Sequence, residues 1–149
     1  MKDATDILWG IYEQNLIYCR HHENQRASVT RFIITVTAVV IGLITFDKEL
    51  SLLDVPLGLF VIGLGVFGVF FTKKQYERFS HHYERSRKIR DKLQEIIENM
   101  DISTLNREAD SNNIKYFPWL SKRSLRWFWE SLHILIVILG ISLVIGAII

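Results

Sequence analysis

Residues 55–72 read VPLGLFVIGLGVFGVFFT, a run of 18 residues without a charged side chain. An α-helix rises about 1.5 Å per residue, so roughly 20 residues cross the hydrocarbon layer of a bilayer. Two more uncharged runs flank this one, FIITVTAVVIGLITF at 32–46 and SLHILIVILGISLVIGAII at 131–149, where His133 is the only ionisable side chain. The three runs predict an all-α membrane protein with three membrane helices. Buried helices of a soluble protein are the alternative.

The first two runs are joined by a short acidic segment and should form an antiparallel helical hairpin. A turn centred near residue 50 sets Gly42 opposite Gly58, and Ala38 beside Gly65. Small residues that face each other allow helix backbones to approach closely in lipid. We therefore predict that these four residues make the helix-packing contact of the hairpin.

Both helices of the hairpin should continue beyond the lipid into a cytoplasmic stem. Residues 6–46 contain no proline and carry an apolar stripe at helical spacing, which predicts one long helix. From Tyr76, positions 76, 79, 83, 86, 90, 93, 97 and 100 step by three and four, and six of the eight are apolar. This coiled-coil-like seam predicts that the second helix also runs on. The expected organisation is a membrane hairpin with its stem at 1–100, a loop and interfacial helix at 101–130, and a C-terminal membrane helix at 131–149.

Charge decides the expected orientation. The segment 73–129 carries thirteen Lys and Arg against eight Asp and Glu, and basic residues near membrane helices stay in the cytoplasm. Trp119, Trp127, Phe128 and Trp129 form an aromatic cluster of the kind that lies at a membrane interface. We therefore expect the N-terminus in the cytoplasm and the C-terminus on the far side of the membrane.

Two histidine doublets, His21–His22 and His81–His82, fall at one height of the predicted hairpin. Imidazoles bind zinc and titrate near neutral pH, so a metal site or a pH-sensitive site is one interpretation. Adjacent residues on a helix point about 100° apart, so only one histidine of each doublet can face the seam. The alternative is a set of polar residues at a hydrated junction.

A basic strip lies on the predicted stem, where Arg85, Lys88 and Lys92 project from one face of the second helix. Such a strip could bind a nucleotide, an oligonucleotide or another polyanion. The alternative is a solvated face that is neutralised by acids of the first helix.

Three threonines, Thr30, Thr37 and Thr45, share a broad face of the first membrane helix. They could line a polar path if several hairpins assembled around an axis. The alternative is that each hydroxyl bonds back to its own helix. The sequence has no nucleophile elbow, no glycine-rich phosphate loop and no metalloprotease signature, so we expect neither an enzyme nor a cofactor. The expected partners are further copies of the chain and membrane lipid.

The segment YCRHH at 18–22 leads into two membrane helices, and the charged segment KKQYERF at 73–79 follows them after a short turn. In this arrangement residues 8–97 resemble the SLATT proteins, small bacterial membrane proteins proposed as effectors in conflict and antiphage systems. The third run is an addition to their two-helix plan. The resemblance implies a homo-oligomeric effector of the bacterial inner membrane that forms a channel or perturbs permeability, gated by a nucleotide signal or a sensor protein. A non-enzymatic scaffold that tethers a cytoplasmic partner is the alternative function.

Overall fold

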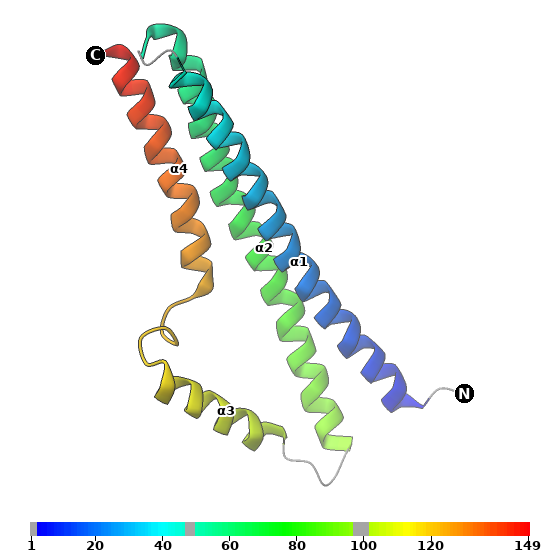
Figure 1. Ribbon diagram of the computed structural model, residues 1–149. Helices are drawn as coiled ribbons and strands as arrows, with labels where there is room; N and C mark the ends of the chain where they lie inside the picture. The colour runs from blue at the N-terminus through cyan, green and yellow to red at the C-terminus, as the bar shows by residue number, and fades with distance from the viewer. Residues whose placement is uncertain (1–2, 47–49, 97–101) are drawn as a thin grey trace. The chain divides into compact units, whose positions relative to one another are not determined.

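The computed structural model describes residues 3–46, 50–96 and 102–149, and over these residues the chain forms helices and no strand (Figure 1). Three helices are long and apolar enough to cross a membrane, namely α1 (Ala4–Ile44), α2 (Val55–Ile96) and α4 (Leu125–Ile148). A shorter helix, α3 (Ile102–Tyr116), and a 3-10 turn, η1 (Leu52–Asp54), complete the described elements. The predicted all-α class and the three apolar helices are confirmed.

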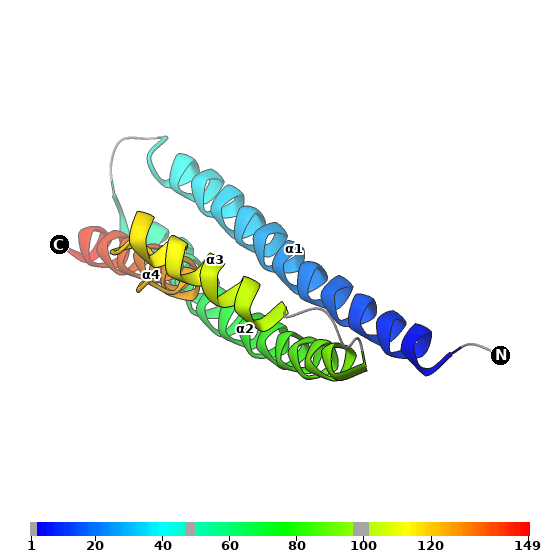
Figure 2. The same ribbon diagram turned by 90° about the horizontal axis from the view of Figure 1, so that it is seen from below.

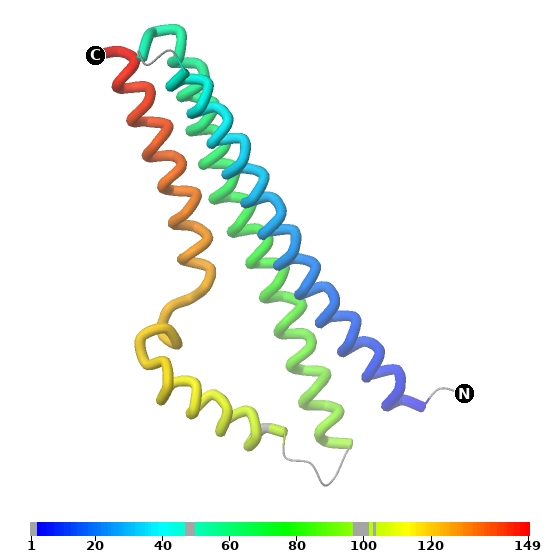
Figure 3. The backbone as a smooth tube through the Cα atoms, viewed as in Figure 1, coloured from blue at the N-terminus to red at the C-terminus, as the bar shows by residue number. Residues whose placement is uncertain are grey.

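The turn between α1 and α2 is closed by local hydrogen bonds. The backbone N–H of Ser51 donates to Oδ2 of Asp54 at 2.9 Å, and the backbone N–H of Asp54 donates to the carbonyl of Ser51 at 2.9 Å. Pro56 then occupies the first turn of α2, where its fixed φ and missing N–H suit a helix start. No further proline occurs before Pro118, so α2 can run without interruption. The tube in Figure 3 shows α1 and α2 running in opposite directions.

The chain divides into two compact units, each built from pieces of several helices. The stem unit comprises Met1–His22 and Glu77–Leu125, and the membrane unit comprises Glu23–Tyr76 and Arg126–Ile149. Within the membrane unit α4 lies alongside the first half of α2 (Figure 2). The third apolar helix therefore packs with the apolar parts of α1 and α2, whereas the sequence pattern set residues 131–149 apart.

The membrane unit has an apolar core where its three helices meet. The buried centre consists of Ile33, Val40 and Ile44 from α1, Val61 from α2 and Ile136 from α4. Buried positions recur at steps of three and four along each helix, the spacing of helices that cross at a shallow angle. Large apolar side chains on the outer faces are exposed, as expected of helices surrounded by lipid.

The stem unit is held by a narrower seam with polar members. Asn15 and Cys19 of α1 and Ser86 and Leu93 of α2 are buried. The Sγ of Cys19 lies 3.7 Å from the carbonyl oxygen of Phe79, to which it donates a weak hydrogen bond. The pairing of α1 with α2 therefore continues in this unit.

The predicted seam of α2 holds at Ser86 and Leu93 and fails at Tyr83, which is 45% exposed. Its neighbour His82 turns toward α1 instead, because Nδ1 of His82 shares a hydrogen bond with Oδ1 of Asn15 at 3.0 Å. That polar pair takes the seam position and leaves the larger phenol at the surface. Positions 97 and 100 of the predicted seam lie outside the described residues.

The segment 101–130, predicted as a loop and an interfacial helix, contains α3. α3 is 15 residues long and carries polar residues on most of its surface. The helix ends at Tyr116, just before Phe117 and Pro118, because proline disfavours a helical backbone at the residue that precedes it.

Candidate functional site in the membrane unit

Three glycines of α2, Gly58, Gly65 and Gly68, face α4. A β-carbon added to Gly65 would lie 2.6 Å from Cγ2 of Val137 and 3.0 Å from the carbonyl oxygen of His133. A β-carbon added to Gly140 of α4 would lie 3.0 Å from the carbonyl oxygen of Gly58. The backbones of α2 and α4 therefore approach closely at several levels, and glycine is what allows it.

The axial register of α1 against α2 is the predicted one, but the helices are rotated so that the predicted glycine faces do not meet. Gln25 and Gln75, equidistant from residue 50, are joined by a hydrogen bond of 3.2 Å. However, a β-carbon on Gly42 would meet nothing within 4 Å, and Ala38 is exposed. Gly42 therefore does not pack on Gly58. The reason is that α4 occupies the glycine face of α2, whereas α1 meets α2 through larger β-branched side chains.

Among the described residues of the membrane unit, five polar residues are buried. They are Arg26, Thr30 and Thr37 of α1, Thr72 of α2 and His133 of α4, and none is more than 5% exposed. Polar and ionisable groups at membrane depth are expensive to bury and are retained mainly where they serve a function. These five residues, called the polar core below, are the candidate functional site.

At the centre of the polar core, the imidazole of His133 meets the hydroxyl of Thr30. Nε2 of His133 lies 3.1 Å from Oγ1 of Thr30. The ring lies directly on Gly68 of α2, where a β-carbon would overlap it. Among the described residues Nδ1 has no hydrogen-bond partner, so the geometry favours the tautomer that carries its hydrogen on Nε2 and donates to Thr30.

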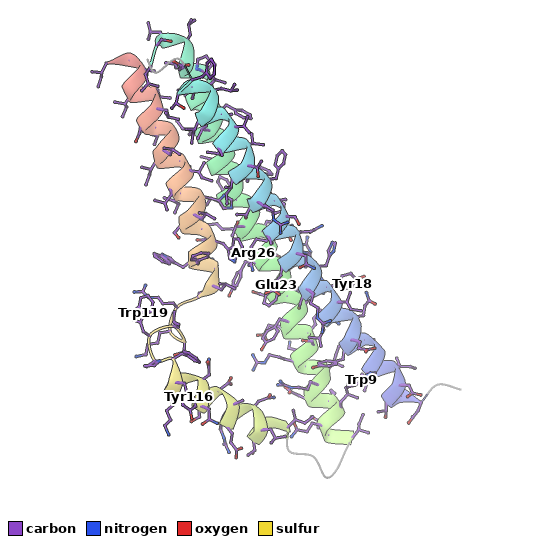
Figure 4. The ribbon with its side chains drawn as sticks, viewed as in Figure 1. Trp9, Tyr18, Glu23, Arg26, Tyr116 and Trp119 are labelled. Carbon is purple, nitrogen blue, oxygen red and sulfur yellow. The ribbon has the colours of Figure 1, made fainter. Side chains whose placement is uncertain are left out.

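One helical turn away, Arg26, Thr72 and Trp129 lie at the next level of the unit. The guanidinium carbon of Arg26 is 5.3 Å from the centroid of the Trp129 ring, a cation–π contact. The neighbouring acid is Glu23, whose Oε1 is 4.0 Å from Nη2 of Arg26 (Figure 4). Within the described chain, Nε of Arg26, Oγ1 of Thr72 and Nε1 of Trp129 are buried without a hydrogen-bond partner. Three donors at one level thus lack acceptors among the residues that the structure describes.

The three threonines predicted to line a pore do not share one environment. Thr30 and Thr37 are buried in the polar core. Thr45 is exposed, and its hydroxyl donates to the carbonyl of Ile41 at 2.9 Å, which is the back-bond considered as the alternative. Two of the three threonines are therefore buried inside the three-helix unit, and the third lies on its surface.

The histidine doublets meet in the stem unit through one member of each. The rings of His22 and His82 stack with centroids 5.6 Å apart, and the ring of Tyr18 lies 4.8 Å from that of His82. His21 and His81 are exposed. Burial, followed by the charge of His22, lowers the pKa of His82. No cluster of three or more metal-ligating side chains occurs in the described part of the chain, so this geometry supports the pH-sensitive interpretation better than the metal site.

The predicted anion-binding strip lies open to solvent. Arg85, Lys88 and Lys92 are all exposed. Nζ of Lys92 is 2.6 Å from Oε2 of Glu95, and this hydrogen bond raises the pKa of Lys92. One of the three cations is therefore already neutralised by its own helix.

A different set of cations lines a groove of about 500 Å³ between α2 and α3 in the stem unit. Its lining is Tyr83, Arg87 and Arg90 from α2, and Asn106, Arg107 and Asp110 from α3. Arg87 and Arg90 each also lie 3.1 Å from an acid of α2, whereas Nδ2 of Asn106 is buried without a partner in the described residues. Guanidinium groups beside an aromatic ring suit a phosphate-bearing ligand. The sequence pattern missed this groove because α3 was expected to be mostly loop.

The polar core was only partly visible in the sequence. His133 stands out as an ionisable residue within an apolar run, which is by itself a signal of function. Arg26 and Thr72 gave no such signal, since their burial depends on where α4 packs. Comparison of the chain with protein-family models, with curated proteins and with solved structures gives no match.

Proposed function

We propose that this chain is a homo-oligomeric membrane protein that raises the permeability of its membrane under the control of a cytoplasmic ligand or partner. The polar core carries the proposal. Thr37, Thr72 and His133 each hold a polar atom in an apolar three-helix unit with no hydrogen-bond partner among the described residues. An unsatisfied buried polar group destabilises a static bundle by about 1–3 kcal/mol. A role beyond packing is the most economical explanation for keeping three of them.

A path for ions would require more than one copy of the chain. Ile33, Val61 and Ile136 fill the centre of the membrane unit, so water can enter only between copies or after the helices rearrange. In either case the polar core supplies the hydroxyl and imidazole groups that such a path needs.

The stem unit offers a surface for self-association. Ile7, Ile11 and Tyr18 lie on one face of α1 and are between 41% and 52% exposed. Apolar side chains gathered on the surface of a segment outside the lipid favour a protein interface. The excess of Lys and Arg in 73–129 supports a cytoplasmic stem, with the C-terminus outside the inner membrane of a bacterium. A controlling ligand would then bind in the groove between α2 and α3.

Leakage from liposomes tests the proposal. Purified protein should release a trapped ion or small dye, and the rate should rise more steeply than linearly with the ratio of protein to lipid. Thr37→Val removes a buried hydroxyl without changing side-chain shape, and should change the leakage rate severalfold. Thr45→Val removes an exposed hydroxyl that bonds only to its own helix, and should leave the rate at the wild-type value. A protein that stays monomeric in detergent and leaves liposomes intact, with or without nucleotides, would refute the proposal.

A scaffold that tethers a cytoplasmic partner is the second candidate. The exposed apolar face of the stem favours it too, because the same face could bind a different protein. Overproduction separates the two functions, since a permeability effector collapses the membrane potential of the cell and a scaffold leaves it intact.

A further inference from the structure

An apolar groove of about 280 Å³ lies between α1 and α4 in the membrane unit. Ile34, Ala38 and Ile41 line it from α1, and Leu135 and Leu139 are among the residues that line it from α4. Its lining is almost entirely apolar and it opens on the outer surface of the helices. At membrane depth, a groove of this kind is complementary to an acyl chain.

The same two helices carry an incompletely neutralised cation about two turns nearer the stem. The side chain of Arg26 is buried, and its guanidinium lies over the ring of Trp129. Nε of Arg26 and Nε1 of Trp129 are buried and have no hydrogen-bond partner among the described residues. A desolvated guanidinium with an unused N–H requires an acceptor, and an anionic one satisfies both its charge and its hydrogen bond.

The protein supplies only part of what Arg26 needs. Oε1 of Glu23 is 4.0 Å from Nη2, at the limit of an ion pair, and the Glu23 side chain is 46% exposed. A water molecule could accept one hydrogen bond here, but it would not neutralise the charge. A phosphate diester could accept from both Nε of Arg26 and Nε1 of Trp129. The carboxylate of Glu23 would then lie beside the phosphate and favour a positively charged hydrogen-bond donor.

We infer that the membrane unit binds one phospholipid of the phosphatidylethanolamine class between α1 and α4. The phosphate lies at Arg26 and Trp129, the primary ammonium at Glu23, and an acyl chain fills the groove. Choline headgroups have no N–H to donate to Glu23, and glycerol headgroups have no positive charge. The lipid site goes beyond the proposed permeability function and does not depend on it.

Native mass spectrometry of the full-length protein in detergent can count the bound molecules. The probes are phosphatidylethanolamine, phosphatidylglycerol, phosphatidylcholine and inorganic phosphate, each titrated alone. We expect one saturable phosphatidylethanolamine adduct per chain, with the two other lipids bound more weakly. Arg26→Gln should weaken this adduct about tenfold to a hundredfold, as expected for loss of charge-assisted hydrogen bonds. The matched control is Arg31→Gln, which removes an exposed arginine of the same helix and should have no effect.

Further variants separate the contacts of the headgroup from those of the acyl chain. Ala38→Trp fills the groove and should abolish the lipid adduct, whereas Val39→Trp, at a 58% exposed position next to it, should not. Glu23→Gln should remove the preference for phosphatidylethanolamine over phosphatidylglycerol. If Arg26→Gln does not fold, Trp129→Phe removes the Nε1 donor while keeping a smaller aromatic ring at the position, and should still weaken binding severalfold.

Three results would overturn the inference. The first is equal binding of all three lipids by wild type and by the Arg26 and Trp129 variants. The second is a lipid adduct that Ala38→Trp leaves unchanged. The third is an inorganic phosphate adduct of the same affinity as the lipid, which would reassign the site to a soluble phosphate.

Discussion

Replacing Gly65 with alanine tests the contact between α2 and α4 with a single added carbon. That carbon would lie 2.6 Å from Cγ2 of Val137, 2.8 Å from the backbone nitrogen of Val137 and 3.0 Å from the carbonyl oxygen of His133. The valine methyl group can rotate away, but the two backbone atoms cannot move without moving the helix. We therefore expect α4 to be displaced from α2.

The size of the effect follows from two opposing terms. One extra carbon in a well-packed interior destabilises by about 1–3 kcal/mol, and alanine is favoured over glycine within a helix by up to about 1 kcal/mol. With the full helix-propensity gain subtracted, Gly65→Ala should lower the free energy of unfolding by up to about 2 kcal/mol. Gly63→Ala is the matched control, because a β-carbon there would meet nothing within 4 Å. The control should be neutral or slightly stabilising.

The assay is unfolding of the purified protein in mixed micelles by increasing fractions of SDS, followed by far-UV circular dichroism and tryptophan fluorescence. Both variants replace a glycine of α2 with alanine, two residues apart. The effects of helix propensity and of detergent therefore cancel when their unfolding curves are compared. Equal unfolding curves for Gly63→Ala and Gly65→Ala would show that α4 does not rest on the glycine face of α2.

Two more predictions concern polar contacts. Thr30→Val removes the hydroxyl that meets His133 and should destabilise the membrane unit by about 0.6–1.7 kcal/mol in the same SDS assay, whereas Thr45→Val should change nothing; equal effects would contradict a special role for Thr30. The lowered pKa of His82 means that the folded stem favours neutral imidazole, so this contribution to stability is complete above the unfolded pKa of about 6.5 and is lost as the pH falls below it. Thermal unfolding followed between about pH 7.5 and pH 5 should show that loss, and His82→Gln should flatten it; a variant with the wild-type pH profile would assign the loss to another group.

The fold class could be predicted because the decisive signals are local. Three uncharged runs long enough for a bilayer, and no proline between Pro56 and Pro118, leave few options other than long helices. The axial register of the hairpin followed from the shortness of its turn, as the hydrogen bond between Gln25 and Gln75 illustrates.

The rotation of the helices could not be predicted in the same way. Periodicity shows that Gly58 and Gly65 share a face of α2, but not which helix covers that face. Both α1 and α4 could cover the glycine face of α2. In the structure the backbone of α4 makes this close approach, and Gly42 of α1 is exposed. The burial of Arg26 and Thr72 depends on the same choice. The polar core was therefore recognisable only at His133, whose surroundings in the sequence are apolar enough to make any ionisable group unusual.

The glycine face of α2 also bears on how the chain is assembled during synthesis. α2 ends at Ile96 and α4 begins only at Leu125, so the hairpin is made well before the helix that covers it. Until α4 arrives, the surface around Gly58 and Gly65 is open to any helix with the right complement, including the α4 of a neighbouring copy. An α4 exchanged between chains would make the same contacts as one kept within a chain. The contact between α2 and α4 can thus also join two copies of the chain, and this association requires no additional interface.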